Sequence, residues 1–172
     1  LLAINGGDGS KGFVLVGDEA GDNAGYEVSR AGDINGDGYA DLLIGAPHSE
    51  ADNQGEAGET YVIFGTDQGF APEIDLSDLE IGTGEVGFVF RGVDIGDRSG
   101  WSVNAAGDVN GDGIDDVIIG AYLADPNGSA SGETYVVYGK QQLGLEDFTI
   151  AVTGTATETS NGDTARSGGS FY

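Results

Sequence analysis

The stretch Asp33-Ile34-Asn35-Gly36-Asp37-Gly38-Tyr39-Ala40-Asp41 occurs twice in this sequence, and it decides the fold. The second copy is Asp108-Val109-Asn110-Gly111-Asp112-Gly113-Ile114-Asp115-Asp116. In each copy, positions 1, 3, 5 and 9 carry a carboxylate or amide oxygen, and positions 4 and 6 are glycine. Oxygens at alternate positions of a curled loop converge on one point, as they do around a hard divalent cation such as Ca²⁺. Glycine permits the positive φ angles that such a curl requires.

The stretch begins like an EF-hand loop but does not end like one. An EF-hand has a bidentate Glu at position 12 and a helix on each side, whereas position 12 is Ile44 in one copy and Ile119 in the other. Short aliphatic runs ended by glycine follow each copy and are typical of buried strands. We therefore predict a calcium loop between two strands, with these ligands: Asp33, Asn35, Asp37, the carbonyl of Tyr39 and Asp41, and Asp108, Asn110, Asp112, the carbonyl of Ile114 and Asp116.

The alternative is an ordinary Asp/Asn/Gly turn without an ion, because these residues favour turns by themselves. Two copies that keep every oxygen position favour the ion. Three carboxylates within nine residues also repel one another unless a cation lies among them. Mg²⁺ fits less well than Ca²⁺ because it demands a small octahedron and retains its waters.

The composition points in the same direction. The 172 residues include 30 acidic and 6 basic ones, for a net charge of −24, which excludes nucleic acid as a partner and disfavours anionic membrane surfaces. Without cysteine there is neither a disulfide framework nor a thiolate metal site, so calcium would be the staple of an extracellular protein. No apolar run is long enough to cross a membrane, so we expect no direct membrane insertion. The first residue is Leu1, and we expect a processed protein or a fragment.

Sequence similarity between the two copies extends well beyond the loops. At the offset of 75 residues that separates Asp33 from Asp108, residues 12–17 match 87–92 and residues 21–26 match 96–101. After the loss of one residue, 58–65 match 132–139. Repetition this dense indicates a repeat architecture. We assign residues 1–20 to the end of a preceding repeat, 21–95 to the first repeat and 96–154 to the second, with 155–172 as a linker or the start of a third.

Each repeat is expected to contain four strands and no helix. In the first repeat they cover about residues 26–31, 41–44, 60–64 and 88–91, where β-branched and aromatic residues alternate or cluster. In the second repeat, residues 148–154 are a candidate for the fourth strand. Four short antiparallel strands describe one blade of a β-propeller, so the fold class is all-β.

The sequence resembles the FG-GAP repeat, which builds the β-propeller of integrin α chains and of many bacterial surface and secreted proteins. The resemblance lies in the calcium loop, in Gly45-Ala46-Pro47 after it, and in the run 61–65, Tyr-Val-Ile-Phe-Gly. It implies Ca²⁺ at the ligands named above. The second copy has Gly120-Ala121-Tyr122, and Phe-Gly is replaced by Ala24-Gly25 and Ser99-Gly100. Neither departure touches a metal ligand.

Two complete blades do not close a ring, because closed propellers have about four to eight. We therefore expect a piece of a longer protein or, less favoured, a chain that completes its core by self-association. Residues 166–170 echo 98–102 and would begin a third repeat, whereas 155–164 would serve equally as a flexible linker.

No catalytic constellation emerges, and we expect no enzyme activity from this chain. His48 is the only histidine; it is expected in a solvated loop, and its neighbour Ser49 is not placed to form a catalytic pair with it. Six aromatic residues lie at repeat-equivalent positions, and most are expected to pack between blades: Tyr26, Trp101, Tyr61, Tyr135, Phe64 and Tyr138. If a ligand-binding face exists, Trp101 and Tyr122 are its candidates.

The expected function is a calcium-stabilised interaction module, extracellular or on the cell surface, that acts in adhesion. Its partners would be neighbouring blades or a second copy, and an unidentified protein or glycan. The alternatives are the non-catalytic propeller portion of a secreted hydrolase and a structural spacer in a long surface protein.

Overall fold

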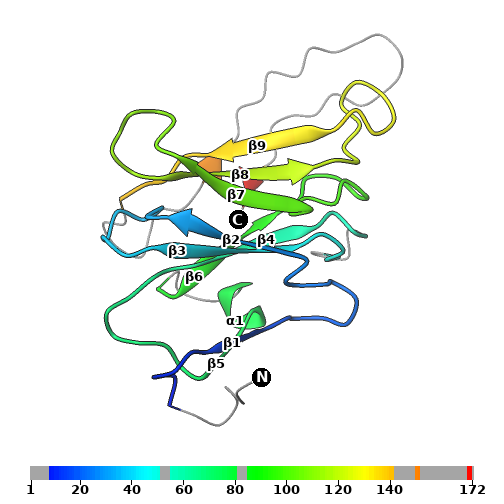
Figure 1. Ribbon diagram of the computed structural model, residues 1–172. Helices are drawn as coiled ribbons and strands as arrows, with labels where there is room; N and C mark the ends of the chain where they lie inside the picture. Colours follow the sequence, from blue (N-terminus) through cyan, green and yellow to red (C-terminus); the bar gives the residue numbers. More distant parts are fainter. Residues whose placement is uncertain (1–7, 51–54, 81–84, 142–149, 152–169, 172) are drawn as a thin grey trace.

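A computed structural model describes residues 8–50, 55–80, 85–141, 150–151 and 170–171. Its described part is built of stacked layers of short strands (Figure 1). One layer is a four-stranded sheet, and a second, three-stranded sheet covers one of its faces. A two-stranded pair and a short helix cover the other face. The all-β prediction and the antiparallel sheets are confirmed.

The first sheet contains the four strands predicted for the first repeat, in the antiparallel order β2-β3-β4-β6. Their bounds are Glu27–Gly32 for β2, Asp41–Ala46 for β3, Glu59–Ile63 for β4 and Gly87–Arg91 for β6. The second sheet has the order β7-β8-β9, with β7 at Ser102–Gly107, β8 at Asp116–Ala121 and β9 at Glu133–Val137. Each of these strands lies within one or two residues of its predicted position or matches it by the repeat offset.

The two sheets share the same register and the same irregularity. Leu42 pairs with Ile63 in the first sheet, and their repeat equivalents, Val117 and Val137, pair in the second. The register shifts between Arg30 and Gly32, and again at the equivalent place between Ala105 and Gly107. Gly32 and Gly107 have φ angles of 81° and 69°, a backbone conformation that favours glycine at a bulge. The bulge bends the chain into each predicted calcium loop.

Three elements lie outside the predicted pattern. β1 (Val14–Val16) pairs in parallel with β5 (Glu73–Asp75), and the single helical turn α1 (Ser77–Glu80) follows. The expectation that the chain contains no helix is therefore wrong. The turn starts where Asp75 Oδ1 accepts hydrogen bonds from the amide and hydroxyl of Ser77, at 3.0 and 2.7 Å. Four residues are too few to produce a helical periodicity in the sequence.

The fourth strand predicted for the second repeat is only partly described. Residues 150–151 form β10 (Ile150–Ala151), but β10 pairs with β11 (Ser170–Phe171) and not with β9, which corrects the prediction. The remainder of 148–154 and residues 166–169 lie outside the described residues. Among the described residues, no helix is long and apolar enough to cross a membrane.

The first sheet buries both of its faces, and each face has a different cover. Leu43, Val62 and Phe64 pack against the second sheet, within one apolar cluster that also contains Val117 and Ile119. Residues of the opposite face, such as Ile44, Tyr61, Ile63 and Val89, pack against Leu76 and Leu79 of the β5–α1 layer and against Leu15.

Equivalent faces of the two sheets have different surroundings. The equivalents of Val62 and Phe64 in the second sheet are Val136 and Tyr138, which are 47% and 56% exposed. The face that the second sheet presents to the first is instead the equivalent of the one that α1 covers. The sheets therefore stack front to back.

Candidate metal centres

The two predicted loops lie at the same end of neighbouring sheets. One loop joins β2 to β3 and the other joins β7 to β8, and β2 packs beside β7. Ser29 Oγ donates a hydrogen bond to Oδ1 of its repeat equivalent Asn104 across this contact, at 2.8 Å. The bulge at the end of β2 and of β7 turns each loop back on itself.

In the first loop, side-chain oxygens accept hydrogen bonds from loop amides and hold the curl. Asp33 accepts from the Asp37 amide at 3.0 Å and from the Gly38 amide at 2.9 Å. Asn35 Oδ1 also accepts from the Asp37 amide, at 3.1 Å, and Asp37 Oδ1 accepts from the Tyr39 amide at 2.8 Å. Gly36 and Gly38 have positive φ angles, as the sequence predicts.

The second loop repeats this geometry. Asp108 accepts hydrogen bonds from the Asp112 and Gly113 amides at 3.0 and 2.9 Å. Asn110 accepts from Asp112, and Asp112 accepts from Ile114, at 3.0 and 2.9 Å. The oxygens at positions 1, 3 and 5 are therefore turned onto the loop itself in both copies.

The carboxylates at position 9, Asp41 and Asp116, are fully buried beneath their loops. Asp41 accepts from the Ile34 amide at 2.8 Å and from the Gly65 amide at 2.7 Å. Asp116 makes the same pair of hydrogen bonds, to Val109 and Gly139, at 2.7 and 2.9 Å. Each carboxylate thus ties its loop to the chain that follows the third strand of its sheet.

Burial raises the pKa of Asp41 to about 6. The two amide hydrogen bonds oppose this shift, and the negative charges of Asp37 and Asp33 add to it. The interior of the first loop is therefore a place where negative charge is unfavourable without a cation.

The residues present fit a hard cation in their chemistry. Each loop offers only carboxylate, amide and carbonyl oxygens, the ligands that Ca²⁺ takes. Among the residues that the structure describes, no group of three or more His, Cys, Asp or Glu side chains is gathered in a way that would hold a metal ion. In the structure these oxygens bind amides, and the assignment of the ten ligands stays a prediction.

The loops are also linked to each other through a residue that the sequence analysis did not single out. Asp115, at position 8 of the second loop, accepts a hydrogen bond from the Asp33 amide at 3.0 Å, and its own amide donates to the Asp33 carbonyl at 3.2 Å. Lys140 donates its amide to the Ile34 carbonyl at 2.9 Å. The first loop has Ala40 at position 8, and this difference between the copies is the signal that could have identified Asp115.

A buried acidic group in the first sheet was also missed. Glu59 is 1% exposed and lies 3.1 Å from Arg91 Nε, while Ser49 Oγ and the Tyr61 hydroxyl donate to it at 2.7 Å. The Ser49 hydroxyl is therefore a hydrogen-bond donor to Glu59. His48 lies in the turn after β3, as expected, but it is 3.1 Å from Glu56 and its side chain is only 21% exposed.

The repeat-equivalent aromatic residues divide into two groups. Tyr61 and Phe64 are buried, and Trp101 and Tyr135 are partly buried. Tyr26 and Tyr138 are 46% and 56% exposed. Tyr26 still packs on Trp101 of the other repeat, with ring centroids 4.5 Å apart, whereas Tyr138 does not follow the expectation of packing between blades. Tyr26 directly precedes β2, at the end of the sheet opposite to the two predicted loops, and Tyr138 follows β9 on the exposed face of the second sheet.

The family model of the FG-GAP repeat matches this chain twice, over residues 24–63 and 99–137. The chain is 32% identical to integrin alpha pat-2 of Caenorhabditis elegans over 114 residues, which is 65% of this chain and 8% of that integrin. It is 37% identical to the phosphatidylinositol-glycan-specific phospholipase D of Rattus norvegicus over 116 residues, or 67% of this chain and 13% of the phospholipase.

A third relative, integrin alpha-PS2 of Drosophila melanogaster, is 32% identical over 131 residues, or 74% of this chain and 8% of that integrin. The matches thus cover between 8% and 13% of these three proteins. Both matched repeats contain one of the two predicted loops and three strands in the same register. The chain therefore belongs to the FG-GAP repeat proteins and is related to the integrin α chains and to the phosphatidylinositol-glycan-specific phospholipases D.

Proposed function

We propose that this chain is a calcium-stabilised FG-GAP module for protein or glycan interaction in adhesion, outside the cell. The observation that carries the proposal is the matched pair of loops. Each places the same set of oxygens above a fully buried carboxylate, and both lie at one end of adjacent sheets.

The role of calcium would be structural. The ion would be held by Asp33, Asn35, Asp37, Asp41 and the Tyr39 carbonyl, and in the second loop by Asp108, Asn110, Asp112, Asp116 and the Ile114 carbonyl. It would offset the repulsion among three carboxylates, one of which is desolvated. The chain's own residues contribute the curl, through the inward hydrogen bonds and the glycines with positive φ angles.

The proposed extracellular location rests on the calcium affinity expected of such a module. Extracellular calcium modules have dissociation constants of about 10⁻⁴ to 10⁻³ M. At roughly millimolar calcium, linkage then gives on the order of 0.4 to 1.4 kcal/mol per site. Cytosolic calcium would leave such sites largely empty, so the module is suited to the exterior of the cell.

A second candidate is the non-catalytic propeller portion of a secreted hydrolase. The similarity to phosphatidylinositol-glycan-specific phospholipases D supports it. In both candidates the chain itself contributes binding and no catalysis, and its partners include neighbouring blades or a second copy. A hydrolytic domain in the same gene would favour this second candidate.

The test is a calcium titration of the purified chain against a double variant, Asp33→Asn with Asp108→Asn. We expect calcium to raise the Tm of the unmodified chain by about 2 to 10 °C, more than Mg²⁺ does, with two ions bound by calorimetry. The double variant should lose most of this shift.

Asp18→Asn is the matched control, because Asp18 is an exposed aspartate outside both loops. It should keep the full calcium response. An unmodified chain whose Tm does not respond to calcium would refute the proposal.

A further inference from the structure

Asp115 joins the two predicted calcium loops by two hydrogen bonds to the same residue. Its carboxylate accepts from the Asp33 amide at 3.0 Å, and its amide donates to the Asp33 carbonyl at 3.2 Å. Asp33 is position 1 of the first loop. Asp115 is position 8 of the second loop and lies between two of its predicted ligands, Ile114 and Asp116. The contact therefore connects the first ligand of one loop to the last two ligands of the other.

A second bridge runs beside the first through backbone atoms. The Lys140 amide donates to the Ile34 carbonyl at 2.9 Å. The amide of Ile34 donates to the buried carboxylate of its own loop, Asp41, at 2.8 Å. Gly139, which precedes Lys140, donates its amide to the buried carboxylate of the second loop, Asp116, at 2.9 Å. One hydrogen bond between loop segments thus lies between the two carboxylates at position 9.

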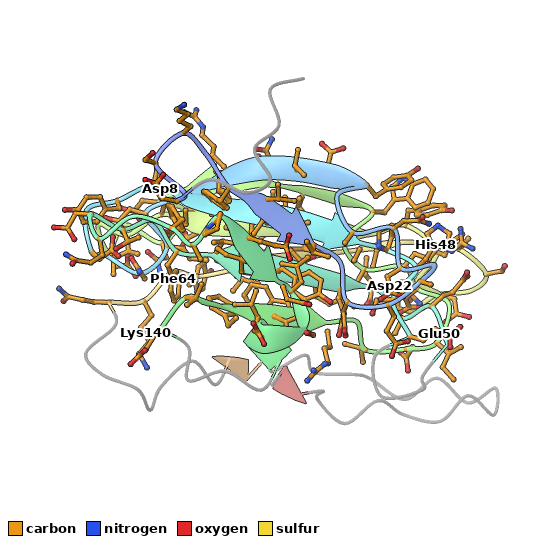
Figure 2. The ribbon with its side chains drawn as sticks, turned by 90° about the horizontal axis from the view of Figure 1, so that it is seen from below. Asp8, Asp22, His48, Glu50, Phe64 and Lys140 are labelled. Atoms are coloured by element: carbon orange, nitrogen blue, oxygen red, sulfur yellow. The ribbon has the colours of Figure 1, made fainter. Side chains whose placement is uncertain are left out.

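Both bridges lie at the base of the loops. Figure 2 shows Lys140 and Phe64, the residue after β4, at one end of the molecule and His48 at the other. Asp115 is half-buried at this end, whereas positions 5 and 6 are exposed in both loops. The loops therefore share a base and have separate tips.

A glycine makes room for the Asp115 side chain. Gly32, directly before Asp33, has a φ angle of 81°, and a methyl group there would collide with the Asp115 carboxylate. Its repeat equivalent, Gly107, has a φ angle of 69° and open space at the same position. The first loop has Ala40 at position 8, without a carboxylate. The link is therefore specific to the junction between these two repeats.

This link would carry order from one loop to the other. In each calcium-free loop, repulsion among three carboxylates opposes the curled conformation. With the second loop loaded, Ile114 and Asp116 would be fixed, and so would Asp115 between them and the Asp33 backbone that it holds. The first loop would then bind its ion with one ligand already ordered, at a smaller loss of conformational entropy. The effect must be reciprocal, because the coupling free energy belongs to both sites.

We propose that Asp115 is a positioning residue that couples the two calcium loops, so that loading one loop raises the calcium affinity of the other. The inference rests on the calcium role proposed above and adds cooperativity to it. Repulsion between two like-charged ions acts in the opposite direction, and the negative charge of Asp115 at the junction reduces it. We expect a coupling factor of about three to ten, near the lower end for coupled sites, because the link consists of few hydrogen bonds.

Calcium titration calorimetry measures the coupling factor with one loop disabled at a time. Asp112→Asn leaves the dissociation constant of the first loop alone, and Asp37→Asn leaves that of the second. The product of these two constants, divided by the product of the two stepwise constants of the unmodified chain, is the coupling factor.

The same cycle in an Asp115→Ala background should give a factor of about one. The loop substitutions remove the same charges in both cycles, so their long-range effects cancel in the comparison. Asp115→Asn keeps an oxygen that accepts from the Asp33 amide, and it should keep most of the coupling.

The two bulge glycines provide a matched pair of variants. Gly32→Ala displaces the Asp115 carboxylate without changing Asp115, and it should lower the coupling factor toward one. Gly107→Ala places the same strained backbone conformation in the other bulge without such a collision, and it should retain the factor.

Hydrogen exchange of the Asp33 amide gives a readout that does not depend on affinity. In Asp37→Asn only the second loop can be loaded, and we expect calcium to slow the exchange of this amide about three- to tenfold. Asp37→Asn combined with Asp115→Ala should show no such response. A merely structural role of Asp115 would alter the exchange without calcium but not the response to calcium.

The outcomes separate the coupling from the calcium role itself. Two loops that bind calcium with a coupling factor of one in the unmodified chain would refute the coupling and leave the calcium role intact. A factor that survives Asp115→Ala, or that is lost equally in Asp115→Asn, would overturn the role given to the hydrogen-bonded link. No calcium binding at either loop would refute the coupling and the proposed function together.

Discussion

Asp41 combines burial, hydrogen bonding and repulsion in a single side chain. Both of its oxygens accept backbone amides, which favours the carboxylate, yet desolvation dominates and raises its pKa to about 6. The unfolded chain would hold this group at the ordinary value of 3.8. The folded calcium-free protein therefore binds a proton that the unfolded chain releases, and this difference links stability to pH.

We predict that lowering the pH from about 7 to 5 stabilises the calcium-free protein through Asp41. Because the folded pKa lies above the unfolded one, the contribution of Asp41 is most favourable below about pH 4 and is lost as the pH rises through about 6. With calcium the trend should reverse, since protons compete with the ion for the same oxygens. Thermal unfolding across this range, with a chelator and with calcium, measures both trends.

Asp41→Asn separates this effect from the titration of other acids. The amide cannot accept both hydrogen bonds equally, so the variant should lose about 1 to 3 kcal/mol at pH 5. The difference in stability between the two proteins should shrink toward pH 7, where the unmodified carboxylate is ionised. A difference that does not change with pH would contradict the assignment.

Among the elements, β3 and β8 show why the sequence Gly-Ala follows each loop. Gly45 in β3 lies against the backbone of Gly100, so a methyl group at Gly45 would collide with the Gly100 carbonyl oxygen. A methyl group at its equivalent in β8, Gly120, would come too close only to the Ser102 hydroxyl, which can move. The first glycine lets the two repeats approach closely, and the second has no such neighbour among the described residues.

We predict that Gly45→Ala destabilises the protein by about 1 to 3 kcal/mol, because backbone atoms cannot yield without moving a strand. Gly120→Ala should cost less than about 1 kcal/mol. Denaturant unfolding of the two variants gives the comparison directly. Equal losses would mean that the contact between the repeats does not limit the space at Gly45.

The strands β2, β3, β7 and β8 could be predicted because each begins or ends at an acidic loop of fixed spacing, and β4, β6 and β9 because β-branched and aromatic residues cluster in them. The parallel pairing of β1 with β5 could not, since it joins residues about 60 positions apart through contacts that leave no local pattern. The single turn of α1 is too short to show a period. The exposure of Tyr26 was missed because an aromatic residue at a repeat position looks the same whether it faces a core or solvent.

The curled conformation of the two loops could likewise be predicted from spacing, while the ligand assignment stays a prediction. The contacts of Asp115 and the ion pair between Glu56 and Arg98 could not be predicted. Asp115 acts on Asp33, which lies in the other repeat, and Glu56 meets Arg98 from 42 residues away. Contacts between repeats depend on how the sheets stack. This stacking arises only in the folded structure, and neither repeat sequence alone predicts it.

At the scale of the whole molecule, charge is the dominant feature. Thirty acidic residues against six basic ones give a net charge of −24, and a compact shape brings these charges closer together. Folding without calcium therefore works against self-repulsion that extends beyond the two loops.

We predict that sodium chloride raises the Tm of the calcium-free protein between about 0.05 and 0.5 M, because screening shortens the range of repulsion from more than 10 Å to a few ångströms. The gain should be smaller when calcium is bound, since the ions already offset the densest charge. Scanning calorimetry in both series tests this. A Tm that falls with salt would mean that favourable ion pairs outweigh the repulsion.

The front-to-back stacking of the two sheets gives the assembly a direction. A twofold axis would bring identical surfaces together, but here the face of the first sheet that carries Val62 packs against the face of the second that carries Val117, so the contact is heterologous. Such a contact can be repeated from one sheet to the next until a ring closes or another element covers the terminal face. The layer of α1, β1 and β5 covers the face of the first sheet that points away from the second sheet. Among the described residues, the side of Val136 and Tyr138 is the exposed one, and a further repeat could pack there in the same orientation.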